Sequence, residues 1–369
     1  MDLTIELELV NLYIYFFETL LYLSFAFTGG YILLLFIPDH SKPAVKNPFD
    51  LFQYAILGIP LFSFISIIRT TIILRDFAQD MSFLQVLLIV LKDYSYGNAW
   101  IWNLIICTGM YMITVLCDFH QKWTKWALAF TWIGSILAHG WASHPTGFSA
   151  TWGLLSQSIH VAAVSIWLGT LIVVAWFTTG AMNWKAFTRW FTPLSISSIV
   201  LIIVAGLVMM SLIVDGYISS WGINYGEALL LKHLVFLPLL LLGFMNGFLT
   251  KLTNNGTKER KLKWWLRMET FIALAVLMIT AYMGVQEPPH EDEFEQPSPS
   301  LLFKFLHGNV QDLALQWNWN VSHLIMMVLG LIALSLLNPF YKKDKRGLFA
   351  TFAIIGVILP FLGLLLSVK

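Results

Sequence analysis

Residues 152–177, WGLLSQSIHVAAVSIWLGTLIVVAWF, form a long apolar stretch that contains no Asp, Glu, Lys or Arg. A stretch of this length and composition is typical of a transmembrane helix, which needs about 20 apolar residues to cross the hydrocarbon core. Comparable stretches recur along a chain of 369 residues that is 58% hydrophobic and only 12% charged. The sequence therefore predicts an all-α fold, a polytopic transmembrane helical bundle in the cell (cytoplasmic) membrane, with the lipid bilayer as its surroundings.

About ten membrane spans are predicted from the apolar stretches. They cover residues 12–37, 51–74, 98–117, 124–144, 152–177, 191–214, 228–250, 264–284, 320–338 and 348–367. A further apolar segment, 82–92, is too short to cross a bilayer, and we expect it to form an interfacial helix.

The distribution of basic residues predicts the orientation. The loops after spans one, three, five, seven and nine, with their flanks, hold 16 of the 22 Lys and Arg residues. Because cytoplasmic loops carry an excess of Lys and Arg, these loops are expected in the cytoplasm. Both termini are then outside, as is the acidic, proline-containing loop 286–319.

In this orientation seven of the nine histidines fall on the outer side. Five of them lie in or at the ends of spans: His139, His144, His160, His233 and His323. Imidazole is costly in hydrocarbon without a partner, so histidines inside a membrane are candidates for function. The simpler interpretation is a hydrogen bond between helices. His290 and His307, in the outer loop, could capture an incoming metal.

Methionines lie in the same outer half. Met326 and Met327 follow His323 by three and four residues, which places the three side chains on one helix face. Imidazole suits copper, and thioether sulfur prefers Cu(I). Methionine also fills irregular gaps in apolar cores, so packing is the alternative role.

Several classes of function are not expected from this sequence. The net charge is +1, and no basic patch or phosphate-binding loop stands out, so we expect no nucleic-acid partner. No ATPase motif appears, and we expect no enzyme activity.

The stretch HVAAVSIWLGTL, residues 160–171, resembles the histidine–tryptophan–leucine–glycine signature of the copper resistance protein D (CopD) family. Further motifs follow in the family's order, from RWFTPLSISS at Arg189 through Gly206 to NYGEALLLKHLVFLPLLLLGFMNG at residues 224–247. The matching positions in that last stretch are Tyr225, Gly226, Leu229, Leu230, Lys232 and Asn246.

The resemblance also covers ILAHGWASH, residues 136–144, where Gly140 replaces the family's alanine. A second departure is Trp190, which interrupts the arginine–phenylalanine–serine motif. The resemblance divides the chain into N-terminal spans (1–123), a CopD-like core (124–285), the outer loop (286–319) and a C-terminal pair of spans (320–369).

What the resemblance implies is copper movement across the cytoplasmic membrane, generally uptake. It makes His139 and His160 the principal copper ligands, with His144 and His233 secondary; the histidine–methionine pattern adds His323, Met326 and Met327. No fused copper-binding CopC-like domain is present, so a separate extracytoplasmic CopC-like carrier is an expected partner.

Two other functions remain open from the residues. His139, His160 and His233 could serve as axial ligands of a b-type haem in a redox membrane protein. The chain could also be a copper chaperone that assembles an oxidase without transport.

Overall fold

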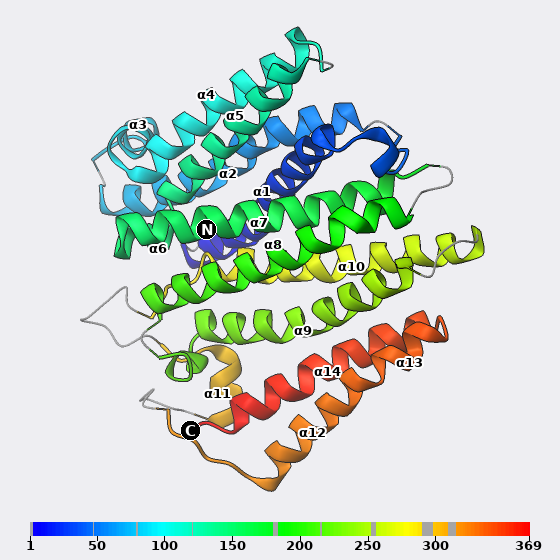
Figure 1. Cartoon of the computed structure of the whole chain (residues 1–369). Helices are drawn as coiled ribbons and strands as arrows, with labels where there is room; N and C mark the ends of the chain where they lie inside the picture. The colour runs from blue at the N-terminus through cyan, green and yellow to red at the C-terminus, as the bar shows by residue number, and fades with distance from the viewer. Residues whose placement is uncertain are drawn as a thin grey trace. The chain divides into compact units, whose positions relative to one another are not determined.

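The structure, a computed structural model, describes residues 3–369 except 47, 79, 120, 180–183, 215, 252–255, 290–297 and 309–314. Within these residues the chain forms helices and no β-strand, apart from isolated bridges that pair Val45 with Thr178 and Trp317 with Val368. The all-α prediction is confirmed. The helices belong to two compact units, Met1–Ile213 and Val214–Lys369, each considered by itself (Figure 1).

Unit 1 contains eight α-helices and one 3-10 helix among its described residues. They are α1 (Leu3–Phe36), η1 (Asp39–Ser41), α2 (Phe49–Phe77), α3 (Phe83–Asp93), α4 (Ser95–Leu116), α5 (Lys122–Trp141), α6 (His144–Phe148), α7 (Ala150–Phe177) and α8 (Trp184–Ile213).

Unit 2 contains six α-helices and one 3-10 helix in the part that the structure describes. They are η2 (Ser219–Gly222), α9 (Asn224–Lys251), α10 (Gly256–Met283), α11 (Leu301–His307), α12 (Val321–Ser335), α13 (Leu337–Lys342) and α14 (Arg346–Leu366).

Nine helical segments of the described chain are long and apolar enough to cross a membrane, and they correspond to nine of the ten predicted spans. The tenth prediction, 124–144, forms the 20-residue helix α5. This helix is less apolar than the other nine because it includes Lys122, Lys125 and His139. The ninth predicted span is divided into α12 and α13, which meet at Leu336.

The short segment predicted at 82–92 forms α3, a helix of 11 residues. Ser82 and Gln85 form a capping box that satisfies backbone N–H groups at its first turn. Val86 and Val90 are buried against α2, whereas Leu88 is exposed. This one-sided burial suits a helix that lies along a surface.

Two glycines determine how closely α1 and α7 pack in unit 1. A Cβ atom on Gly169 would lie 1.7 Å from the carbonyl oxygen of Ala26, and one on Gly30 would lie 2.1 Å from the carbonyl carbon of Gly169. Only glycine allows backbones to approach so closely, a common device where membrane helices cross. Gly169 is part of the motif quoted above, and its role here is packing.

Trp190, the residue that interrupts the family motif, ties α8 to the segment after α1. Its indole N–H donates a 2.8 Å hydrogen bond to the carbonyl oxygen of Ser41. Nearby in sequence, the Lys46 N–H donates to the Phe177 carbonyl. The loops after predicted spans one and five therefore lie at the same end of unit 1.

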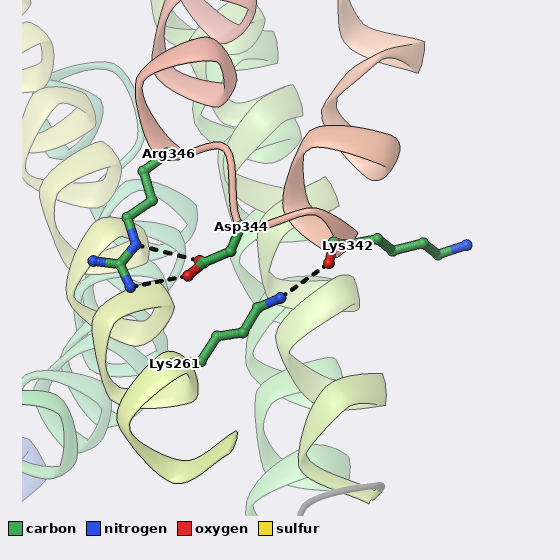
Figure 2. A network of polar contacts seen from close by, with 4 residues as sticks. All are labelled: Lys261, Lys342, Asp344 and Arg346. Carbon is green, nitrogen blue, oxygen red and sulfur yellow. Dashed lines mark hydrogen bonds and ion pairs between the residues drawn. The ribbon is translucent and has the colours of Figure 1, made fainter. Parts of the chain in front are cut away.

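The same holds in unit 2 for the loops after predicted spans seven and nine (Figure 2). The Lys261 ammonium donates to the carbonyl oxygen of Lys342 at 3.1 Å, and Arg346 pairs with Asp344 at 3.2 Å. The Arg346 guanidinium also lies 4.3 Å from the centre of the Trp264 ring. These contacts collect basic residues at one end of the unit, as the predicted cytoplasmic loops require.

Candidate functional site

Among the residues that the structure describes, no three His, Cys, Asp or Glu side chains lie close enough together to hold a metal ion. What each predicted histidine can bind therefore depends on its own ring nitrogens and on their hydrogen-bond partners. A histidine is ready to bind a metal when one ring nitrogen is held by a hydrogen bond and the other carries a lone pair.

His160 of α7 has this arrangement. Its Nδ1 atom lies 3.1 Å from the carbonyl oxygen of Ile202 in α8. A carbonyl oxygen only accepts, so Nδ1 carries the proton of the neutral ring and Nε2 carries the lone pair. Gly206 borders the ring, because a Cβ atom there would lie 3.8 Å from Cε1 of His160. The motif glycine in α8 thus adjoins the histidine.

His139 faces a different helix. It lies in the last turn of α5, and its ring centre is 5.2 Å from that of Phe25 and 6.5 Å from that of Tyr22, both in α1. Gly140 beside it packs on Ser158 of α7. His139 therefore contacts α1, and His160 contacts α8.

His144 opens the short helix α6 and interacts electrostatically with Glu18 of α1. The Glu18 carboxylate accepts a 2.8 Å hydrogen bond from Ser66 in α2 and another from Tyr22. Through Tyr22 and Glu18, α1 joins His139 to His144. Sequence reasoning missed Glu18, although an acid inside the apolar stretch 12–37 is a signal of function in its own right.

His233 of α9 is the predicted ligand in unit 2 that lies within the family-like motif. Its Nδ1 atom lies 2.8 Å from the hydroxyl oxygen of Tyr217, and the two ring centres are 5.6 Å apart. Burial raises the pKa of Tyr217 to about 12, so the hydroxyl stays neutral at physiological pH. Sequence reasoning missed Tyr217, because nothing in a loop sequence identifies its partner on another element.

His323 has a structural use. The Asn320 backbone N–H donates to its Nδ1 atom at 3.2 Å, which completes a capping box at the start of α12. Since Nδ1 accepts, its lone pair is engaged, and the neutral ring carries its proton on Nε2. In this conformation the ring offers no lone pair to a metal.

Met326 and Met327 lie one turn further along α12 and face α14. A Cβ atom on Gly363 would lie 3.3 Å from Cβ of Met326 and 3.7 Å from Cγ of Met327. Both methionines therefore contact α14 in the described chain.

The other histidines are placed as follows. His307 in α11 contacts the Leu365 carbonyl oxygen at 3.1 Å through Nε2 and stacks near Phe303. His40 is exposed in η1. His120 and His290 lie outside the described residues.

A buried polar network also lies within unit 2. The Asn246 amide donates to the Glu269 carboxylate at 2.7 Å and to the Trp265 carbonyl oxygen at 3.3 Å. The Tyr341 hydroxyl donates to the Asn246 amide oxygen at 2.9 Å. These contacts link α9, α10 and α13, and they give the motif asparagine a structural role.

Comparison with known proteins connects the chain to copper. Residues 185–283 match the family model of copper resistance protein D. The match covers most of α8 and all of α9 and α10, so it includes His233. The stretch HVAAVSIWLGTL and His139 lie outside the matched residues.

Two curated proteins are similar to the chain. It is 26% identical over 191 residues to the copper transport protein CutJ of Bacillus subtilis (strain 168), across 49% of this chain and 33% of that protein. It is 19% identical over 201 residues to the inner membrane protein YebZ of Escherichia coli (strain K12), across 52% of this chain and 69% of that protein. The chain thus spans about a third of the length of CutJ. No solved structure matches the chain.

Proposed function

We propose that the chain is a membrane protein of the copper resistance protein D family, and that it binds copper ions and carries them across the cell membrane into the cytoplasm. The similarity to the copper transport protein CutJ supports this cargo. The role is that of a transporter, and copper is its substrate.

The observation that carries the proposal is the orientation of His160. Its Nδ1–H is held by a backbone carbonyl of α8, which fixes the tautomer of the neutral ring, and Nε2 is the atom proposed to bind copper. A histidine that only joins two helices would make the same hydrogen bond. A measurement of copper binding is therefore needed to tell a copper ligand from a helix–helix contact.

The proposed ligands in unit 1 are His160, His139 and His144. Since no three His, Cys, Asp or Glu side chains of the described residues form a metal-binding group, copper would be passed between sites of few ligands. This suits transport, because an ion held by many strong ligands is not released. His233, Met326 and Met327 are proposed as secondary positions in unit 2, and His323 could join them only after its Nδ1 atom releases the Asn320 N–H.

The proposed direction is inward, with histidines on the outer side receiving copper from a CopC-like carrier or from solution. No ATPase motif is present in the sequence, so the concentration gradient, the membrane potential or a cytosolic acceptor would drive the movement.

Copper accumulation tests the proposal. Cells that express the chain should contain more copper than matched cells without it, and a His139→Ala/His160→Ala double variant, inserted at the same level, should lose the increase. An unchanged copper content with correctly inserted wild-type protein would refute transport and favour a chaperone role.

The purified protein provides a second measurement. We expect bound copper and no Soret absorption after expression with sufficient haem. A Soret band with stoichiometric haem would instead identify a b-type cytochrome.

A further inference from the structure

A pocket of about 640 Å³ opens in unit 2 between two loop segments, 216–219 and 315–317. Tyr217 lines this pocket, and its hydroxyl reaches His233 on α9. The pocket and the histidine are therefore connected by a single side chain.

Tyr217 is held in place by aromatic packing. Its ring meets the buried Trp221 edge to face at 5.6 Å, and Trp221 in turn meets Trp317 at 5.8 Å. Trp317 stacks on Trp319 at 5.1 Å, and its backbone pairs with Val368. These contacts restrict the Tyr217 ring, so its hydroxyl is positioned before any ligand arrives.

The hydrogen bond with Tyr217 engages one ring nitrogen of His233 and leaves the other nitrogen for a ligand. A phenol oxygen accepts as well as donates, so Nδ1–H of His233 can donate to Tyr217 while Nε2 keeps its lone pair. The structure places His233 among the exposed residues of α9. A histidine that ligates a metal usually donates its other N–H to a neighbouring group in this way.

We propose that Tyr217 is a positioning residue that orients the imidazole of His233 to bind copper. The proposal rests on the proposed function, since copper is its ligand.

A double-mutant cycle on the full-length purified protein tests the proposal, with Cu(I) as the probe and affinity as the readout. Tyr217→Phe removes only the hydroxyl and should weaken copper binding by about 10- to 100-fold, the usual effect of losing such a partner. His233→Ala should weaken it at least as much. In the His233→Ala background, Tyr217→Phe should have no further effect.

The matched control is Tyr341→Phe, which also removes a hydroxyl hydrogen bond in unit 2, but one made to Asn246. It should leave copper affinity unchanged. The proposal would be overturned if Tyr217→Phe weakened copper binding equally with and without His233, or did not weaken it at all. It would also be overturned if Tyr341→Phe weakened copper binding as much as Tyr217→Phe. If the wild type binds copper and the cycle shows no coupling, only this inference fails; if the wild type does not raise cellular copper, the transport proposal fails.

Discussion

The side-chain amide of Asn246 donates a 2.7 Å hydrogen bond to the buried carboxylate of Glu269 and so joins α9 to α10. Both residues are almost fully buried, with 2% and 4% of their surfaces exposed. A buried carboxylate requires hydrogen-bond donors, and Asn246 supplies one. Asn246 therefore serves the stability of unit 2, which also explains its place in the family motif.

Asn246→Ala should destabilise the protein by about 1–3 kcal/mol, because it leaves a buried carboxylate and a buried phenol hydroxyl without their partner. Tyr341→Phe should cost less, about 0.5–1.5 kcal/mol, since it removes one neutral hydrogen bond. Thermal unfolding in detergent measures both. Thr108→Ala serves as a control, because Thr108 is exposed and bonds only within its own helix. Equal melting temperatures for Asn246→Ala and the control would contradict the stabilising role.

The crossing of α1 and α7 gives a second prediction. Gly169→Ala places a methyl group where the Ala26 carbonyl oxygen already lies, so the helices must separate, at a cost of about 1–3 kcal/mol. Gly109→Ala is the matched control, because nothing lies within 4 Å of the added atom. Alanine favours a helix over glycine, so this control should be neutral or slightly stabilising. A lower melting temperature for Gly109→Ala than for Gly169→Ala would contradict the packing argument.

Much of this fold is predictable from hydropathy. Nine of the described helices match predicted spans, and the short helix α3 was predicted from the length of its apolar segment. The partners of the histidines could not be predicted. His139 and His160 lie on adjacent spans. Their partners depend on how α5 packs against α1 and how α7 packs against α8, and the periodicity of a single helix does not predict that packing.

The sequence contains a signal for one of the polar residues near the histidines. Glu18 is an acid inside an apolar stretch, and that position alone indicates a polar partner within the bundle. Tyr217 gave no such signal, because it lies in a loop and its partner is 16 residues away on α9. The use of His323 as a helix cap was also hidden, since capping depends on where the helix begins.

Glu18 gives a third prediction. Glu18→Gln keeps the size of the side chain and an oxygen for Ser66, but removes the carboxyl group that can ionise near His144. A cation bound at His139 or His144 would lose that attraction, so copper affinity should fall by several-fold. Asp50→Asn is the control, because Asp50 lies at the start of α2 and far along the chain from the predicted ligands. Equal affinities for Glu18→Gln and wild type, measured with the same purified protein, would remove Glu18 from the site.

His160 gives the last prediction. His160→Ala should weaken copper binding by at least about tenfold, which corresponds to ~1.4 kcal/mol, because it removes the imidazole whose Nε2 is oriented by the Ile202 carbonyl. His40→Ala should leave binding unchanged, since His40 is exposed in η1, at the end of unit 1 that the charge distribution predicts to be cytoplasmic. Copper titration of the two purified variants and the wild type makes the comparison.

The same variants separate binding from helix packing. If His160 only joined α7 to α8, His160→Ala would lower the melting temperature of the metal-free protein and leave copper affinity intact. If it binds copper, added copper should raise the melting temperature of the wild type and of His40→Ala, and raise it less in His160→Ala, because a ligand stabilises the folded state in proportion to its affinity.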